Sequence, residues 1–241
     1  ENIAIQLNVL KAARKVGVRK LILFGSSCMY PRECSQPMAE DILLSGKPEP
    51  TSLPYAISKL AGTYMCLAYN KQDQDARFIP VIPNSAYGPH DNFDPKSGHV
   101  LSALMARLHQ AKMSGAESVT LWGSGSPRRE FIHADDVADA CVHLLRQDNA
   151  ALELPLNIGV GVDVSIKELA ELIAEVVGYK GRLEWDLTKP DGAPRKLLDS
   201  ARIQSLGWKS NVGLAEGLTN TYQWYVDNVR IETARVHEAR M

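Results

Sequence analysis

The segment from Lys20 to Pro31 has the sequence KLILFGSSCMYP, an apolar run that passes directly into a polar turn. A short, continuous apolar run bounded by turn residues predicts a strand that is buried on both faces, as in parallel sheets. The polar turn Gly25–Cys28 follows at the carboxyl end of this strand, where open α/β sheets bind their ligands. This one segment therefore predicts both the class of fold and the position of a site.

The rest of the chain alternates between helical and strand patterns. Before the strand, Ile5, Val9, Ala12 and Val16 fall on one face of a helix, which Gly17 is expected to end. Strands are predicted at residues 77–82, 118–122, 156–158 and 182–185. Helices are predicted at residues 55–70, 99–112 and 135–146. A further helix is predicted to begin at a capping box at Ser165 and to end at Val177. Such alternation favours an α/β fold with a parallel sheet.

The composition narrows the class of protein. The 241 residues are 45% hydrophobic and 23% charged, with a net charge of -1, which gives no sign of a nucleic-acid or membrane partner. The sequence has no run of eighteen apolar residues, and its first residues lack the basic start and apolar core that are typical of a signal peptide. Its four cysteines form no CxxC pair, and its histidines have no metal-ligand spacing, so we expect a cytoplasmic protein without a bound metal.

The segment Tyr55-Ala-Ile-Ser-Lys59 carries the clearest chemistry. On a helix, residues at i and i+4 share one face, so the phenol of Tyr55 lies beside the ammonium of Lys59. A nearby cation favours phenolate, and a Tyr so placed can exchange a proton with a carbonyl or alcohol oxygen. Ser26, at the end of the predicted strand, is the candidate to hydrogen-bond the same oxygen.

An ordered set of motifs extends this reading along nearly the whole chain. The strand and Gly-Ser-Ser-x-x-Tyr-Pro are followed by Pro-Tyr-Ala-Ile-Ser-Lys, Tyr87-Gly-Pro-His-Asp-Asn-Phe93, Ser97-Gly-His-Val100, Trp122-Gly-Ser-Gly125, Arg129-Glu-Phe-Ile-His-Ala-Asp-Asp136 and Lys189-Pro-Asp-Gly-Ala-Pro-Arg-Lys196. This set resembles the extended short-chain dehydrogenase/reductase family, also called the NAD-dependent epimerase/dehydratase family. Within it, the match to the GDP-L-fucose synthases is closer.

The resemblance implies a Rossmann-like, doubly wound parallel sheet with a smaller α+β C-terminal substrate domain. It also implies an NADPH-dependent enzyme that epimerises GDP-4-keto-6-deoxy-D-mannose at C3 and C5 and then reduces the C4 ketone. Cys28 is then the expected base and His99 the expected acid of epimerisation, since a thiolate can take a proton and an imidazole can hold one near neutral pH. Reduction uses Tyr55 as proton donor, with Lys59 and Ser26 beside it.

The resemblance further implies two sets of binding residues. NADP(H) is expected to contact Tyr55, Lys59, Pro83 and His99. The GDP-sugar is expected to contact Arg107, Trp122, Arg129 and Lys196, because arginine and lysine side chains match phosphate oxygens. Family members commonly pair through two long helices, one of them the Tyr55 helix, so a homodimer is expected.

The sequence departs from the family pattern in two places. It has no G-x-x-G-x-x-G turn, so we expect an N-terminally shortened cofactor domain at 1–88 and 117–140, with a substrate domain at 89–116 and 141–241. A chain so shortened is expected to bind NADPH poorly and to expose a sheet edge. Ser85 stands where the family usually carries Asn. The alternatives are another nucleotide-sugar epimerase, dehydratase or 4-reductase, or a non-catalytic remnant.

Overall fold

The computed structural model describes residues 1–73, 75, 77–147 and 154–238, with side chains described as far as residue 228. The chain forms two compact units, each built from three segments. The first unit comprises Glu1–Ala86, Arg129–Asp163 and Arg195–Asn211; the second comprises Tyr87–Arg128, Val164–Pro194 and Val212–Met241.

The first unit is built on a parallel sheet, as the apolar strands predict. Its strands are β1 (Lys20–Phe24), β2 (Arg77–Pro83) and β7 (Leu156–Ile158), in the order β1-β2-β7. Leu23 of β1 pairs with Pro80, and Val81 pairs with Leu156 of β7. The carboxyl ends of all three strands therefore lie at one edge of the sheet.

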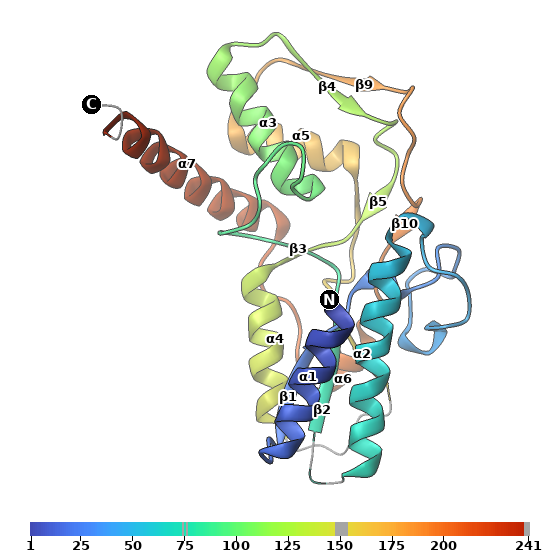
Figure 1. Ribbon diagram of the computed structural model, residues 1–241. Helices are drawn as coiled ribbons and strands as arrows, with labels where there is room; N and C mark the ends of the chain where they lie inside the picture. The colour runs from blue at the N-terminus through green and yellow to red at the C-terminus, as the bar shows by residue number, and fades with distance from the viewer. Residues whose placement is uncertain (74, 76, 148–153, 239–241) are drawn as a thin grey trace. The chain divides into compact units, whose positions relative to one another are not determined.

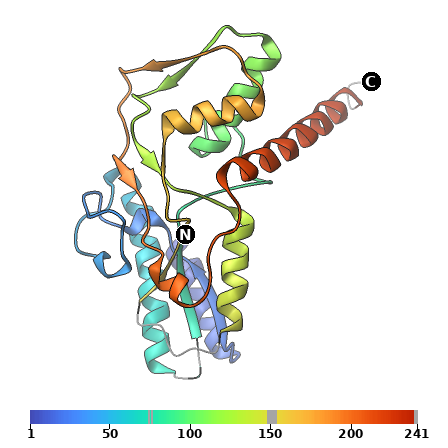
Figure 2. The ribbon, with the colours of Figure 1, turned by 180° about the vertical axis from the view of Figure 1, so that it is seen from behind.

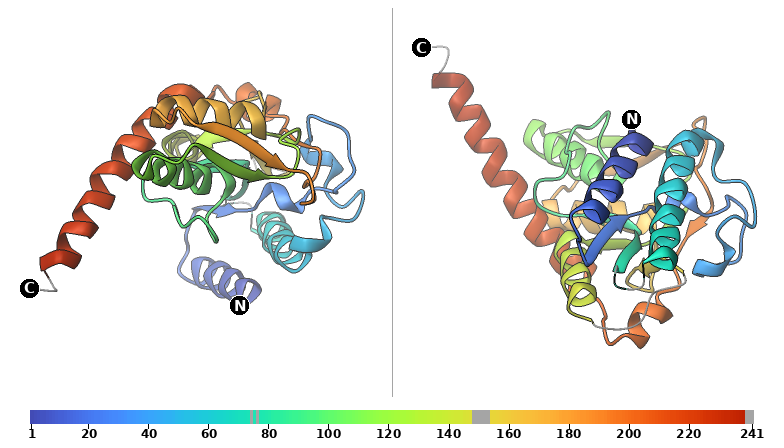
Figure 3. Two further views of the ribbon diagram at one scale, coloured as in Figure 1. Left: turned by 90° about the horizontal axis from the view of Figure 1, so that it is seen from above. Right: turned by 60° about the horizontal axis from the view of Figure 1, so that its bottom comes forward.

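Helices cover both faces of this sheet. Neighbouring residues of a strand point to opposite sides, so successive residues pack against different helices. Phe78 of β2 packs with Leu10 of α1 (Asn2–Lys15) and Cys66 of α2 (Leu53–Gln72). The next residue, Ile79, packs instead with Leu144 of α4 (Ala134–Arg146). Figures 1 and 3 show α1 and α2 side by side on one face.

A close approach fixes α1 against α2. Gly62 of α2 faces the side chain of Gln6, and a Cβ added at Gly62 would overlap that side chain and lie 3.3 Å from Leu23. Gln6 is buried and donates hydrogen bonds to the carbonyl oxygens of Asn2 and Ser58, both at 3.0 Å. A residue larger than glycine at position 62 would displace the Gln6 side chain and disturb these two hydrogen bonds.

The apolar face of α1 that the sequence pattern defines is exposed. Ile5, Val9 and Val16 are 58%, 48% and 75% exposed, while Leu10 and Ala13 on the neighbouring face fill the core. Hydrophobic periodicity locates an apolar face without saying what covers it.

The second unit packs helices on a strand pair (Figure 2). The parallel pair is β4 (Ser118–Trp122) and β9 (Arg182–Asp186), and α3 (Val100–Ser114) packs against α5 (Ile166–Val177). The expected capping box is present: the Ser165 hydroxyl accepts from the Glu168 amide at 3.1 Å, and the Glu168 carboxylate accepts from the Ser165 amide at 2.7 Å. Helix α7 (Leu214–Glu238) packs against α5.

Short elements complete the fold. They are η1 (Ser27–Met29), η2 (Glu40–Ile42), η3 (Pro50–Ser52), β3 (Ser85–Tyr87), β5 (Arg128–Arg129), β6 (Phe131–His133), β8 (Val164–Ser165), β10 (Arg195–Lys196) and α6 (Ala201–Ser205). The domain boundary expected at residue 88 lies close to the first boundary between the two units, which falls between Ala86 and Tyr87. Residues 117–128 group with the second unit, and 141–163 and 195–211 with the first, which differs from the division expected from the sequence. No helix in the described part of the chain is long and apolar enough to cross a membrane.

Candidate functional site

The turn after β1 is closed by its own backbone and by Ser26. The Cys28 amide donates to Ser26 Oγ at 3.2 Å, which caps the short helix η1. The Gly25 amide donates to the Val81 carbonyl at 2.7 Å, continuing the sheet pairing past the end of β1. A Cβ at Gly25 would lie 2.8 Å from the Met29 side chain, so the turn needs glycine there. The result places Ser26 and the half-buried Cys28 at the carboxyl edge of the sheet.

Helix α2 brings Tyr55 and Lys59 to the same edge. Lys59 Nζ donates to the carbonyl oxygen of Phe24, the last residue of β1, at 2.7 Å. The same Nζ lies 5.8 Å from the centre of the Tyr55 ring, and Tyr55 is 41% exposed. Partial burial lowers the pKa of Lys59 by desolvating its ammonium. The expected Tyr–Lys pair is therefore assembled beside the Ser26 turn, with the phenol open to a ligand.

Three more of the expected residues lie in the first unit. Pro83 ends β2, next to the end of β1 in the sheet. Lys196, on β10, reaches the turn itself: its Nζ lies 3.9 Å from Cys28 Sγ. Arg129, on β5, is partly buried, and desolvation lowers the pKa of its guanidinium. Lys59 and Lys196 thus contact the two ends of the segment from Phe24 to Cys28.

The other expected residues lie in the second unit. His99 is exposed at the N-terminal cap of α3, and its side chain makes no capping hydrogen bond there. Arg107 donates from Nη2 to the Thr120 carbonyl of β4 at 2.6 Å. Trp122, at the end of β4, is 71% exposed, with Lys189 Nζ 5.7 Å from its ring centre. An exposed indole flanked by a cation is suited to stacking on a planar base.

A buried carboxylate that the sequence reasoning did not single out supports the site. Glu130 is fully buried, and it accepts hydrogen bonds from the Asn84 side chain at 2.5 Å and from the amides of Gly161 at 2.7 Å and Leu198 at 3.0 Å. Burial raises the pKa of Glu130, opposed by these hydrogen bonds. The residue lies within the Arg129–Asp136 motif, but its partners come from distant segments. Asn84, next to the unusual Ser85, is one of them.

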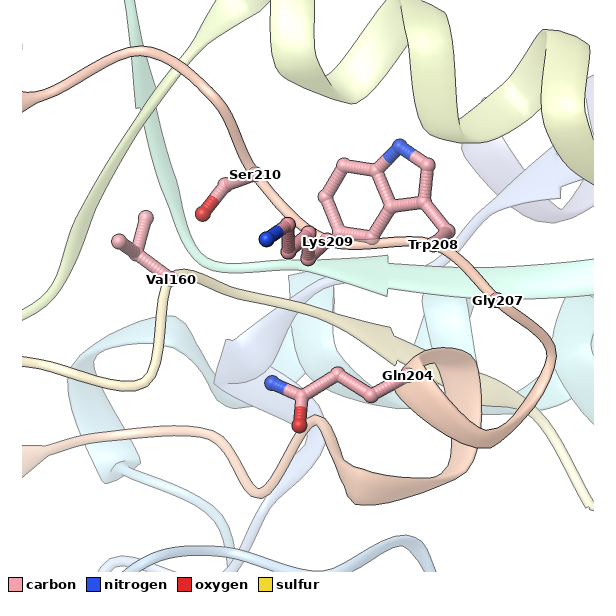
Figure 4. Close-up of a pocket in the computed structure, with 6 residues that line it drawn as sticks. All are labelled: Val160, Gln204, Gly207, Trp208, Lys209 and Ser210. Atoms are coloured by element: carbon pink, nitrogen blue, oxygen red, sulfur yellow. The ribbon is translucent and has the colours of Figure 1, made fainter.

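A separate hollow lies in the first unit, away from these residues. It has a volume of about 450 Å³ and is lined by Val160, Gln204, Gly207, Trp208, Lys209 and Ser210 (Figure 4). None of the expected catalytic residues lines it. The indole N–H of Trp208 is already used, since it donates to Asp139 at 2.9 Å. Among the described residues, no group of three or more His, Cys, Asp or Glu side chains could hold a metal ion.

Comparison with known proteins identifies the family of the chain. Residues 1–159 match the model of the NAD dependent epimerase/dehydratase family. Over 229 residues the chain is 54% identical to a putative GDP-L-fucose synthase 2 of Arabidopsis thaliana, covering 95% of this chain and 69% of that protein. It is 48% identical to GDP-L-fucose synthase of Escherichia coli K12, covering 95% and 73%.

Solved structures show the same relationship. A GDP-L-fucose synthetase from Naegleria fowleri superposes with a TM-score of 0.88 at 28% identity, covering 95% of this chain and 72% of that one. A GDP-6-OMe-4-keto-L-xylo-heptose reductase from C. jejuni superposes with a TM-score of 0.87 at 33% identity, covering 94% and 76%. The chain belongs to the NAD dependent epimerase/dehydratase family, in the group whose members are named GDP-L-fucose synthase.

Proposed function

We propose that this protein epimerises GDP-4-keto-6-deoxy-D-mannose at C3 and C5 and reduces its C4 ketone with NADPH, giving GDP-L-fucose. The observation that carries the proposal is the group at the carboxyl edge of the sheet. It holds a Tyr–Lys pair beside Ser26, as reduction of a ketone requires, together with a thiol, which reduction alone does not. The names of the similar proteins support the same substrate class.

Reduction uses the residues on β1 and α2. Nicotinamide, when bound, supplies the hydride. Tyr55 gives its proton to the sugar O4, and Lys59 stabilises the phenolate that remains. Ser26 donates a hydrogen bond to O4 and holds the ketone in place. The positions of two residues fit a bound NADP(H). Lys59 Nζ is hydrogen-bonded to the Phe24 carbonyl of β1 at 2.7 Å, and the Tyr55 side chain is exposed beside it.

Epimerisation uses the ketone before it is reduced. The C4 carbonyl acidifies the hydrogens on C3 and C5, so inversion needs a base on one face and an acid on the other. We assign Cys28 as the base and His99 as the acid. His99 is exposed and not engaged in capping α3, which leaves its ring available for proton transfer.

Substrate binding uses cations for the diphosphate and an aromatic ring for the nucleotide. We assign Arg107, Arg129 and Lys196 to the phosphates and Trp122 to the base or sugar. The exposure of Trp122 supports this role, because an indole kept for the core would be buried.

We further propose that the protein is a homodimer paired through α1 and α2. Ile5 and Val9 of α1 and Tyr64 of α2 are 58%, 48% and 38% exposed, and the two helices lie side by side. Apolar side chains gathered on neighbouring helices favour association, and a second copy supplies a matching face by two-fold symmetry.

The test is a product assay. Purified full-length protein is mixed with GDP-4-keto-6-deoxy-D-mannose and NADPH, and the sugar product is identified. NADPH consumption with GDP-L-fucose as product supports the proposal. NADPH consumption with C3 and C5 unchanged would instead indicate a simple 4-reductase, the activity that the name of the C. jejuni heptose reductase suggests. No consumption would contradict both.

A further inference from the structure

Lys196 makes a contact that a phosphate-binding role does not explain. Its Nζ lies 3.9 Å from Cys28 Sγ, and the two residues are 168 positions apart in the chain. We propose that Lys196 is a positioning residue for epimerisation, its ammonium being the counter-ion that holds Cys28 as the thiolate. The role in epimerisation rests on the function proposed above, whereas the pairing of the two groups does not.

The backbone around Lys196 is held by its neighbours. The Leu197 amide donates to the Gln36 side chain at 2.9 Å, and the Leu198 amide donates to buried Glu130 at 3.0 Å. The Lys196 carbonyl accepts from the Glu130 amide at 3.3 Å. This segment is therefore fixed on both sides of Lys196, which limits where its side chain can reach.

Packing fixes Cys28 relative to the same segment. Met29, the residue after Cys28, and Leu198, two residues after Lys196, belong to one core cluster and are each 1% exposed. Core packing therefore holds the two backbone segments that carry the thiol and the ammonium close to each other.

The groups on α2, which packs against η1, are otherwise engaged. Lys59 donates to the Phe24 carbonyl at 2.7 Å, and its ammonium lies beside the ring of Tyr55. The charge of Lys59 therefore acts on Tyr55, the proposed proton donor for reduction. A separate cation at Cys28 allows the two half-reactions to be tuned independently.

Two further titratable groups lie close to this contact in the sequence. Arg195, next to Lys196, is paired with the carboxylate of Asp163. Tyr30, two residues after Cys28, is buried, and desolvation raises the pKa of its phenol, so it stays neutral. Lys196 is thus the cation that the structure places against the thiol.

The proton transfer balances with this arrangement. The thiolate takes H⁺ from C3 or C5, the C–H bond breaks, and its electron pair passes into the enolate whose charge lies on O4. An S–H bond forms, and the acid on the opposite face returns a proton to the same carbon. Lys196 keeps its protons throughout, and its positive charge offsets the negative charge on sulfur before the transfer.

The pairing is tested on the free protein by alkylation, because only the thiolate reacts with iodoacetamide. The rate for the Cys28 peptide is followed by mass spectrometry from pH 5 to 10 in the wild type and in Lys196→Gln, Lys196→Arg and Lys47→Met. Lys47 is an exposed lysine of the same unit and controls for the loss of one charge. Cys34, whose pKa burial raises, provides a reference thiol inside each sample.

We expect Lys196→Gln to slow the labelling of Cys28 at neutral pH by about tenfold, because the thiolate loses the cation beside it. Lys196→Arg and Lys47→Met should label Cys28 at the wild-type rate. Should Lys196→Gln fail to fold, the wild type still decides: native Cys28 must keep a larger share of its pH 10 labelling rate at pH 7 than the same thiol does in the urea-unfolded protein.

Unchanged labelling of Cys28 in a folded Lys196→Gln variant would overturn the proposal. Weaker GDP binding by the same variant would then show that Lys196 serves only the diphosphate. Where Cys28 labelling responds as expected, the rate at which the C3 and C5 hydrogens of the substrate exchange in deuterated water should show the same pH dependence as the labelling. Expected labelling with no exchange would support the ion pair and contradict the proposed epimerase function.

Discussion

Lys59 Nζ is hydrogen-bonded to the carbonyl oxygen of Phe24 at 2.7 Å, which joins the Tyr55 helix to the last residue of the central strand. The bond fixes the ammonium at the point where β1 passes into the Ser26 turn. The same ammonium lies 5.8 Å from the centre of the Tyr55 ring, so this one side chain contacts both the strand end and the catalytic candidate. We therefore expect ketone reduction to depend on the turn geometry through Lys59.

Replacing Lys59 tests this coupling. We expect Lys59→Met to lower kcat for ketone reduction by about 10²-fold or more, because the phenolate loses its stabilising cation and proton donation fails. Hydrogen exchange at C3 and C5 should change much less, since Cys28 lies beside a different lysine. Stopped assays of NADPH oxidation and of deuterium uptake measure the two steps separately. Equal losses in both steps would show that Lys59 supports the whole site.

Glu130 predicts a specific dependence of stability on pH. Its pKa is raised in the folded protein, so its contribution to stability is present below its unfolded pKa and is lost as pH rises through the folded value. We expect Glu130→Gln to remove this part of the pH dependence.

The substitution also turns an acceptor of several hydrogen bonds into a partial donor, at a cost of roughly 2 kcal/mol or more. The melting temperature should fall by about 4–8 °C for a chain of this size. Thermal unfolding of the wild type and of Glu130→Gln between pH 4 and 8 measures both effects. Parallel curves for the two proteins would show that Glu130 does not titrate in this range.

Trp122 predicts how the nucleotide is held. Removing an aromatic ring that stacks on a base costs about 1–3 kcal/mol, so Trp122→Ala should raise KM for the GDP-sugar between about fivefold and a hundredfold, with kcat little changed. Inhibition by GDP should weaken in parallel, while inhibition by pyrophosphate should not. Loss of affinity for both inhibitors would mean that the indole supports the phosphate site instead.

The exposed face of α1 predicts the oligomeric state. A charge placed in an apolar interface is costly because it must be desolvated, so Val9→Glu should convert the proposed dimer to monomer. Met113→Glu is a matched control, since Met113 is 71% exposed on α3 of the second unit. Light scattering after size exclusion measures the mass. A wild-type monomer would contradict the proposed dimer, and a Val9→Glu dimer would contradict pairing through α1.

The sequence predicted those features whose signals are local. The strands at residues 20–24, 118–122 and 156–158 and the helix from Ile166 to Val177 agree with the structure to the residue, because turn residues or a capping box mark their ends. The Tyr55 helix starts two residues earlier than predicted, at Leu53, since Pro54 is tolerated in a first turn. Tyr55 and Lys59 share a face as their spacing requires.

Long-range relationships could not be predicted in this way. Nothing in the spacing of Lys196 and Cys28 indicates that their side chains meet, because strand pairing and core packing decide it. Glu130 shows the same limit: its motif was visible, but its partners Asn84, Gly161 and Leu198 come from three other segments. The exposure of Val9 was equally hidden, since periodicity defines a face and not its partner.

Epimerisation and reduction are proposed to occur at one site, with Cys28 serving only the first. Cys28→Ser tests this directly in the assay with GDP-4-keto-6-deoxy-D-mannose and NADPH. We expect the variant still to oxidise NADPH through Tyr55 and Lys59 but to yield the 4-reduced sugar with C3 and C5 uninverted, whereas the wild type yields GDP-L-fucose. Formation of GDP-L-fucose by Cys28→Ser at the wild-type rate would contradict the role of Cys28 as the base.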